Sequence, residues 1–213
     1  MGMGEAMILP QDKIEHYREL DRAANAGYEN QPWVLGHAHY HARIAEALDL
    51  CLAQNPGNVV EIGCLHGAWS VLAAEVCDKH NRRLLCIDPW PEEVYRSHPG
   101  WRNSFETFME VMQPYIYVGA SKVLREYSQS PIAVKAMQDI GPCFTFVDGS
   151  HDYPDVLEDL RNVLPITSAI VVVDDWFSGD VRKATEKALQ EYPEWKMELN
   201  LFPDFGEVYL VKR

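Results

Sequence analysis

Residues 59–67 read VVEIGCLHG, and this stretch decides how the rest of the chain is interpreted. It begins with a short run rich in β-branched side chains, which is typical of a buried strand. Gly63 and Gly67 then complete a Glu-x-Gly-x-x-x-Gly turn, where glycine lets the backbone turn sharply and approach a ligand closely. Residues 66–79 are apolar nearly all round, as in a helix that packs on a sheet. The stretch therefore predicts a strand, a glycine turn and a helix.

The same alternation recurs along the chain. Further apolar runs lie at residues 84–88, 115–119, 143–148 and 169–174, and helical patterns lie at residues 101–112, 121–127, 156–164 and 181–192. Such strands separated by helices indicate βαβ units and a parallel sheet covered on both faces. Residues 195–201 and 207–212 indicate a closing antiparallel hairpin. We therefore expect an α/β fold with a doubly wound, mostly parallel, seven-stranded Rossmann-like sheet, an antiparallel C-terminal hairpin and N-terminal helices.

The beginning of the chain has a different pattern. From Pro10 to Gln54 apolar residues recur near a 3.6-residue period in two stretches, separated by a breaker cluster at residues 26–32. An Asn-Pro-Gly-Asn segment then ends the second stretch. We therefore expect an N-terminal helical extension, residues 1–57, and a main domain, residues 58–213. Two amphipathic helices beside a small core also favour a homo-oligomer.

Composition and charge narrow the class of protein. The 213 residues carry a net charge of −13, with 47% hydrophobic and 24% charged side chains, as in an ordinary globular domain. This acidic balance argues against nucleic acid and anionic membrane surfaces as partners. No apolar run approaches the ~18 residues of a membrane span, and residues 1–10 do not form an export signal. The 5 cysteines include no Cys-x-x-Cys pair, which favours a reducing compartment, the cytoplasm.

Acidic side chains end most of the predicted strands. Glu61, Asp88, Asp148 and the pair Asp174 and Asp175 stand at or near the last positions of these runs. Ligands of open parallel sheets bind outside the carboxyl ends of the strands. Helix or turn capping would explain one such aspartate. Acids on four strand ends of one sheet are better explained by a ligand site.

The glycine turn indicates which cofactor to expect. Its spacing differs from the Gly-x-Gly-x-x-Gly of dinucleotide-binding proteins, which disfavours a nicotinamide dehydrogenase. Together with Asp88 at the end of the next strand, the turn resembles motif I of the class I methyltransferases that use S-adenosylmethionine. The resemblance covers about residues 58–213. It implies that Gly63 and Gly67 line the methionine and ribose portion, that Glu61 holds the loop and contacts the amino end, and that Asp88 binds the ribose.

A second resemblance lies in FVDGSHDY at residues 146–153 and VDDW at residues 173–176. These segments are similar to metal-dependent O-methyltransferases of the methyltransferase 24 family, including those that act on macrolide sugars. The resemblance implies that Asp148, Asp174 and Asp175 hold Mg²⁺. Carboxylate oxygens are suitable ligands for this hard cation.

The general base and one cofactor contact have structural alternatives. His151 matches the place of the base in some relatives, and histidine suits proton removal near pH 7. Capping of the helix that begins near Tyr153 would also explain it, and Asp152 is a weaker candidate base. Ser121, which the pattern places at the start of a helix, is a candidate for adenine binding. Capping explains a serine there equally well.

Two other groups of side chains have a plain structural interpretation. His37, His39 and His41 look like a metal cluster, but only the first and third share a helix face, so packing is preferred. An aromatic cluster after the second strand either packs on itself or forms a wall of the substrate site. Its members are Trp90, Tyr95, His98, Trp101 and Phe105.

These patterns predict an S-adenosylmethionine-dependent, Mg²⁺-dependent O-methyltransferase. Its expected substrate is a hydroxyl group of a small metabolite, such as a sugar or a natural-product scaffold. The alternative is a non-catalytic metal- and nucleotide-binding accessory protein of the same fold in a biosynthetic pathway.

Overall fold

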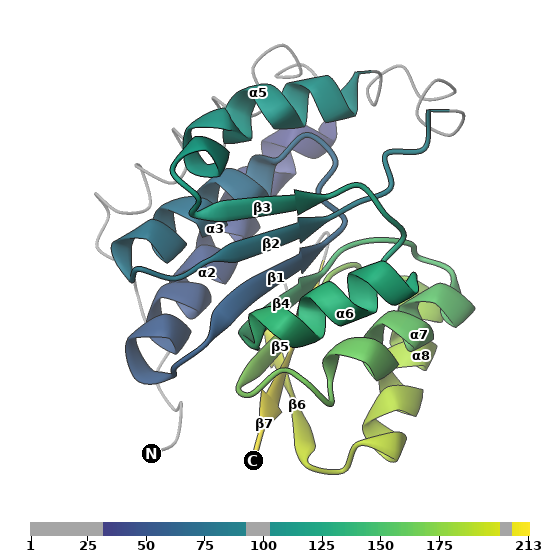
Figure 1. The fold of residues 1–213 in the computed structure, drawn as a ribbon. Coiled ribbons are helices and arrows are strands. Elements are labelled where there is room, and N and C mark those ends of the chain that lie inside the picture. Colours follow the sequence, from purple (N-terminus) through teal and green to yellow (C-terminus); the bar gives the residue numbers. More distant parts are fainter. Residues whose placement is uncertain (1–31, 93–102, 201–205) are drawn as a thin grey trace.

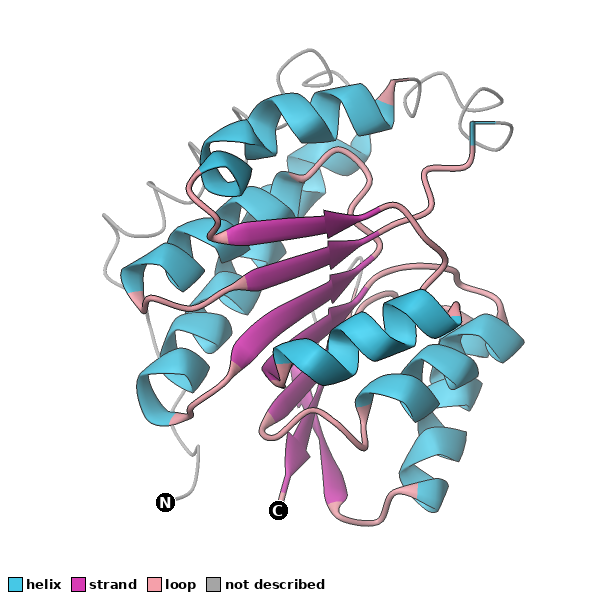
Figure 2. Ribbon diagram, in the orientation of Figure 1, coloured by secondary structure: helices cyan, strands magenta, loops and turns pink. Residues whose placement is uncertain are grey.

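A seven-stranded sheet between two layers of helices forms the protein (Figures 1 and 2). The computed structural model describes residues 32–92, 103–200 and 206–213. The strands are β1 (Asn58–Ile62), β2 (Leu84–Ile87), β3 (Ser121–Leu124), β4 (Pro142–Val147), β5 (Ile170–Val173), β6 (Trp195–Asn200) and β7 (Glu207–Lys212). The helices are α2 (Pro32–Gln54), α3 (Ala68–Lys79), α5 (Ser104–Tyr117), α6 (Pro131–Ile140), α7 (Tyr153–Val163) and α8 (Gly179–Glu191).

The strand order confirms the predicted fold class. It is β3-β2-β1-β4-β5-β7-β6, with parallel pairs from β3 to β5. Strand β7 runs antiparallel to both of its neighbours, β5 and β6. The chain therefore forms a doubly wound, mostly parallel sheet closed by an antiparallel hairpin.

Each face of the sheet has its own hydrophobic core. Helices α2, α3 and α5 cover one face and α6, α7 and α8 cover the other (Figure 1). Strand residues alternate between them: Phe144 and Phe146 of β4 belong to the first core, whereas Val147 belongs to the second. Helix α2 takes part in the first core through Ile44 and Leu48, which are fully buried. The division of the chain at residues 57 and 58 stays a prediction.

The predicted third strand is wrong. Residues 115–119 are the end of α5 and the turn after it, and β3 follows at Ser121–Leu124, where a helix was expected. Phe108 and Met112 are buried and Tyr115 packs beside them, so the apolar run continues one face of α5. A short run of this kind does not distinguish a strand from a buried helix end. Proline usually ends a helix, so Pro114 also favoured the predicted end at residue 112, although it lies inside α5.

Helix α6 was not predicted, although its sequence contains clear boundary signals. Ser130 accepts a hydrogen bond from the backbone N–H of Ala133, Pro131 occupies the first turn, and Gly141 ends the helix in a left-handed conformation. The helix covers the second core through Ala133 and Met137. The helix has only 10 residues, fewer than three turns, so its periodicity is a weak signal.

None of the helices within the described part of the chain has both the length and the apolar character needed to cross a bilayer.

Candidate functional site

Four residues that follow the last positions of parallel strands form a row at one edge of the sheet. Their backbone N–H groups donate to carbonyl oxygens at the ends of neighbouring strands: Gly63 to Ile87 (2.9 Å), Asp88 to Leu124 (3.3 Å), Asp148 to Ile62 (2.8 Å) and Asp174 to Val147 (3.0 Å). The sheet ladder thus extends by one residue at each strand, and Gly63 separates Asp88 from the other two acids. Side chains alternate between the two faces along each strand. The side chains of the three acids therefore point toward the face covered by α2, α3 and α5. Sequence reasoning correctly placed these carboxylates at a common edge.

Asp88 fixes the loop that follows β1. One of its carboxylate oxygens accepts hydrogen bonds from the backbone N–H groups of Cys64 (2.9 Å) and Leu65 (3.1 Å), and the other accepts one from Trp90 (2.7 Å). The indole N–H of Trp90 in turn donates to the carbonyl oxygen of Leu65 (2.8 Å). The side chain is only 3% exposed. Asp88 therefore orders the glycine loop in addition to its predicted role at the ribose.

Both glycines of the loop adopt conformations that other residues rarely adopt. Gly63 has φ 83°, and a Cβ built on it would lie 1.8 Å from the carbonyl oxygen of Asp148. Gly67 has φ 89° and stands directly before α3. The close approach at Gly63 is thus between two strands of the sheet, so this glycine is required by the fold itself.

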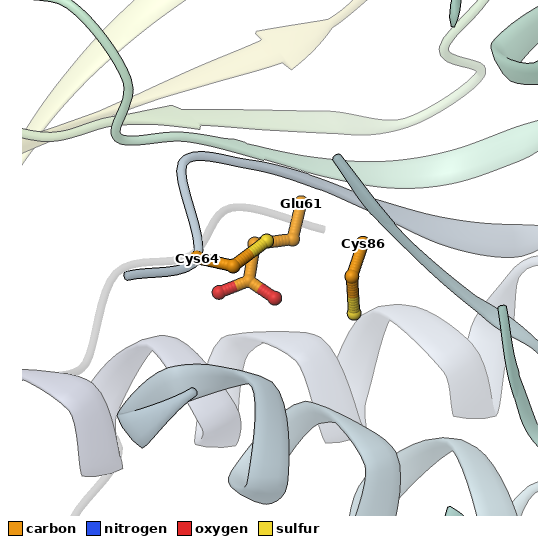
Figure 3. Close-up of side chains that lie close together, drawn as sticks. All are labelled: Glu61, Cys64 and Cys86. Carbon is orange, nitrogen blue, oxygen red and sulfur yellow. The ribbon is translucent and has the colours of Figure 1, made fainter. Parts of the chain in front are cut away.

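Glu61 lies beneath the loop in a buried polar group with Cys64 and Cys86 (Figure 3). Ser70 of α3 donates a hydrogen bond of 2.6 Å to its carboxylate. Burial raises the pKa of Glu61 to about 8 and also raises the pKa of both thiols. Ligand atoms of the three residues lie within 4.8 Å of one another, but protonated acids and thiols are poor metal ligands. We interpret this group as a hydrogen-bonded core that joins β1 to α3.

Asp148, His151 and Asp175 form a second group, at the carboxyl ends of β4 and β5. Their ligand atoms all lie within 4.8 Å of one another, and Nε2 of His151 is 2.8 Å from Oδ2 of Asp175. Burial raises the pKa of Asp148 well above its usual value, and the carboxylates of Asp174 and Asp175 raise it further. A cation would relieve this repulsion, and aspartate and histidine can both bind one. The group therefore fits a divalent metal ion.

The three mutually close residues differ from the predicted metal ligands, because they include His151 and do not include Asp174. Asp174 is 6% exposed and acts on Asp148 electrostatically, but it is not among the three residues whose ligand atoms are mutually close. His151, predicted as the base only, is one of the three. Its pKa is raised, chiefly by the hydrogen bond to Asp175. Asp175 has φ 53°, a left-handed conformation that is uncommon for aspartate and frequent at functional sites.

The structure places Ser121 at the wrong edge of the sheet for cofactor binding. Ser121 begins β3 and pairs with Leu84, the first residue of β2, so it lies at the amino ends of the parallel strands. Asp88 follows the opposite end of β2. The expectation that Ser121 opens a helix and binds adenine is therefore not retained.

The segment after β3 lies at the correct edge and was missed. Asp159 of α7 accepts hydrogen bonds from Ser128 (2.6 Å) and Gln129 (2.8 Å), which holds this segment beside the row. Arg125 donates to the carbonyl oxygen of Trp90 (3.3 Å). The Ser130-Pro131 helix start was the available sequence signal, since it implies that a strand ends before it.

The aromatic residues near the site have different roles. Trp90 is buried, with its ring centroid 5.0 Å from that of Phe105 and 4.8 Å from that of Phe108, so it belongs to a packed core. Phe177, after the metal group, is 56% exposed and is a better candidate for a wall that contacts a substrate. A Cβ at Gly206 would lie 2.6 Å from its ring, so that glycine permits the contact. Tyr95, His98 and Trp101 lie outside the described residues.

Of the three histidines of the N-terminal helix, only His41 has a side chain that the structure describes. His41 is 5% exposed in α2. The side chains of His37 and His39 lie outside the described ones. The preference for packing therefore stays a prediction.

Comparisons with known proteins agree with this geometry. The sequence model of a family described as a methyltransferase domain matches residues 60–176. No curated protein sequence matches the chain. The chain is similar in structure to CalS11, described as a TDP-rhamnose 3'-O-methyltransferase of calicheamicin biosynthesis, with 15% identity, 99% of each chain covered and a TM-score of 0.60.

Two further solved structures have the same fold. The methyltransferase PaMTH1 of Podospora anserina, bound to SAH, has 14% identity and a TM-score of 0.64, with 98% of this chain and 91% of that chain covered. An O-methyltransferase from Bacillus cereus in complex with SAH has 14% identity and a TM-score of 0.57, covering 98% of this chain and 94% of that chain. Likeness at these identities establishes the shared architecture.

Proposed function

Because the chain belongs to this methyltransferase domain family, we propose that it is an S-adenosylmethionine-dependent, Mg²⁺-dependent O-methyltransferase of a small hydroxylated metabolite. The observation that carries the proposal is the row at the carboxyl edge of the sheet, in which Gly63 separates Asp88 from Asp148 and Asp174. One side of the row suits a nucleoside and the other suits a cation. Methyl transfer to a metal-bound hydroxyl needs both.

The glycine loop, residues 63–67, forms the cofactor side of the row together with the side chains that hold it, Asp88 and Glu61. Asp88 holds the loop through three backbone N–H groups, and we assign the ribose hydroxyls of the cofactor to the same carboxylate. Gly63 and Gly67 keep the loop free of side chains, and Glu61 anchors it through Ser70 of α3. The segment that contains Ser128 and Gln129 would close the adenine side.

The metal side would be held by Asp148 and Asp175, with His151 or Asp174 completing the protein ligands. A bound Mg²⁺ would lower the pKa of the acceptor hydroxyl and hold its oxygen as the nucleophile. The carboxylates of Asp174 and Asp175 raise the pKa of Asp148, so a cation would stabilise this group. The ends of β4 and β5 would hold these acids close together in a fixed arrangement.

We propose that His151 takes the proton of the acceptor hydroxyl. Its side chain is about half exposed, and Asp175 orients the ring through the 2.8 Å contact at Nε2. The raised pKa means that the free protein holds the proton on the ring more readily than an isolated histidine does. A cation at Asp175 would weaken this effect, because the same carboxylate would then serve the cation. A bound cation would therefore favour the neutral form of the proposed base.

Methyl transfer itself requires mainly positioning. The acceptor oxygen must lie in line with the transferred methyl group at ~3 to 3.5 Å, and water must be excluded. Exposed Phe177 would supply an apolar wall near the metal group. CalS11, by its name, acts on a nucleotide-linked sugar, and this supports a sugar or a related scaffold as the acceptor.

Cellular location and assembly belong to the same proposal. All 5 cysteines are free and buried, which supports a reducing compartment, the cytoplasm. Tyr117 and Val118 are 90% and 68% exposed at the end of α5, which supports contact with a second copy of the chain. Light scattering of the purified protein would determine the mass in solution.

The test is methyl transfer by the purified protein with S-adenosylmethionine and a panel of hydroxyl compounds, with and without EDTA. Formation of S-adenosylhomocysteine that depends on both the acceptor and the metal is the expected result. Undiminished turnover in EDTA would remove the metal from the proposal. Absence of turnover with every acceptor, combined with tight cofactor binding, would instead favour the accessory-protein alternative.

A further inference from the structure

The row of acids continues onto β7, a strand that runs the other way. Val173 of β5 pairs with Val208, so the next pair along the antiparallel ladder is Asp174 with Glu207. Because β7 is antiparallel, its first residue lies at the edge where the parallel strands end (Figure 1). Alternation along β7 puts Glu207 on the same face as Tyr209, which belongs to the core under α2 and α3. The neighbouring strands β4, β5 and β7 thus each have an acid at this edge of the sheet: Asp148, Asp174 and Glu207.

Glu207 is fully buried and lacks the hydrogen bonds that a buried carboxyl needs. Its side chain is 0% exposed, and neither carboxylate oxygen has a hydrogen-bond partner among the residues that the structure describes. Burial raises its pKa to about 7, and the charge of Asp174 raises it further. The nearby backbone N–H of Glu207 itself lowers the pKa, as do Arg43 and His41. Such an unsatisfied group costs about 1–3 kcal/mol in folding free energy.

Three other buried acids have hydrogen-bond partners within the protein. Ser70 donates to Glu61, Ser128 and Gln129 donate to Asp159, and backbone N–H groups donate to Asp88. The fold therefore satisfies these three carboxyls. Glu207 differs from them, which indicates that its donor comes from outside the described protein atoms.

We propose that Glu207 is a specificity-determining residue that accepts a hydrogen bond from a second donor group of the methyl acceptor, an ammonium or a hydroxyl beside the hydroxyl that reacts. This inference rests on the proposed function. Neighbouring strands are about 4.8 Å apart, so Glu207 stands one strand from Asp174 and about two strands from Asp148. A small acceptor bound at Asp148 and Asp175 spans such a separation. Its second group would reach Glu207 along the row, from the partly exposed carboxylates of Asp148 and Asp175.

The acidic surroundings favour a cationic donor over a neutral one. Asp148, Asp174, Asp175 and Glu207 stand on three adjacent strand ends. A divalent metal ion leaves part of this negative charge uncompensated, so an ammonium group would gain more from Glu207 than a hydroxyl group would. A methoxy group at the same place offers no donor and would leave the carboxyl unsatisfied.

The test uses three matched probes with the full-length protein, Mg²⁺ and S-adenosylhomocysteine. They are 2-aminocyclohexanol, cyclohexane-1,2-diol and 2-methoxycyclohexanol, which share one hydroxyl and differ in the group beside it. Thermal shifts and dissociation constants are measured for the native protein, for Glu207→Gln and Glu207→Met, and for Glu198→Gln on the neighbouring strand as the control. The apparent Tm without probe is recorded for each variant.

We expect the native protein to bind the amine at least about 10-fold more tightly than the methoxy compound, with the diol between them. Glu207→Gln should reduce this difference to less than about 3-fold, and Glu198→Gln should leave it unchanged. Without probe, Glu207→Met should raise Tm, because it removes an unsatisfied buried polar group.

Three results would overturn the inference: equal behaviour of the probes with native protein, an unchanged order in Glu207→Gln, or a fall in Tm for both Glu207 variants, which would mark the residue as structural. Failure of the proposed function has a separate signature. In that case S-adenosylhomocysteine itself would not raise the Tm of the native protein.

Discussion

Nε2 of His151 lies 2.8 Å from Oδ2 of Asp175, so one carboxylate serves both the expected base and the expected cation. Asp175 raises the pKa of His151, because a nearby carboxylate stabilises the imidazolium. Asp175→Asn should therefore lower the pKa of His151, and saturating Mg²⁺ should change it in the same direction. Titration of the histidine ring protons by NMR measures both effects. The signal of His80, which pairs with Asp49 elsewhere, should respond to neither.

Metal binding should depend on the acids at the ends of β4 and β5. Asp148→Asn and Asp175→Asn each remove a charge from the group, so Mg²⁺ or Mn²⁺ affinity should fall at least about 10-fold and activity should fall with it. Affinity for S-adenosylhomocysteine should stay near the native value. Calorimetry with each ligand separates the two sides. Asp180→Asn, an exposed acid beside Lys183, is the control and should change neither affinity.

Asp88 should matter to both folding and cofactor binding. Asp88→Ala leaves three backbone N–H groups of the loop without their acceptor, which should cost about 2–4 kcal/mol in unfolding free energy and lower Tm by roughly 4–15 °C. Cofactor affinity should fall as well. Asp139→Ala, at an exposed pair with Lys135, should stay within about 0.5 kcal/mol of the native protein. A cofactor affinity unaffected by Asp88→Ala would show that the ribose assignment is wrong.

Gly63 and Gly119 provide a matched pair for the close approach at β4. Both have left-handed backbones, φ 83° and φ 77°, but a Cβ at Gly63 would lie 1.8 Å from the carbonyl oxygen of Asp148, whereas at Gly119 nothing lies within 4 Å. Gly119→Ala should thus lower the free energy of unfolding only by the cost of a left-handed backbone, about 1–2 kcal/mol. Gly63→Ala should cost several kcal/mol more and abolish cofactor binding. Urea unfolding of the two variants would refute this contrast if their midpoints agreed.

Stability should fall as pH rises through neutrality. The pKa of Glu61 is about 8 in the folded protein against 4.5 ordinarily, so the folded state keeps a proton that the unfolded chain releases. This contribution is complete below about pH 4.5 and is lost as pH rises to about 8. Asp159, with a pKa of about 7, acts in the same direction. Unfolding free energies at about pH 6 and about pH 9 should differ less in Glu61→Gln than in the native protein, while Glu186→Gln, an exposed control, should keep the native difference.

Much of the fold and part of the site follow from the sequence. The runs that end in Gly63, Asp88, Asp148 and Asp174 are short and apolar, and parallel strands bring their carboxyl ends to one edge. Local pattern alone suffices for such elements. It failed at residues 115–127, where Tyr115 belongs to a helix because it packs against α3, a contact that no local pattern contains.

The remaining features depend on pairings between distant segments. Glu207 begins an ordinary strand pattern, so only the pairing of Val173 with Val208 reveals it as a neighbour of Asp174. The three N–H bonds of Asp88 likewise depend on how the loop after β1 folds over β2. Sequence identifies which residues are chemically capable, whereas the register of the sheet decides which of them meet.

The alternation of side chains along each strand limits how the length of the chain can change. A one-residue deletion inside β4 or β5 would turn Asp148 or Asp174 toward the layer of α6, α7 and α8. Every carboxylate of the row would remain in the sequence, but the row would be broken. Insertions and deletions should therefore be confined to the connections at the opposite edge of the sheet, such as the turn between α5 and β3 at Gly119, where added residues leave the register untouched.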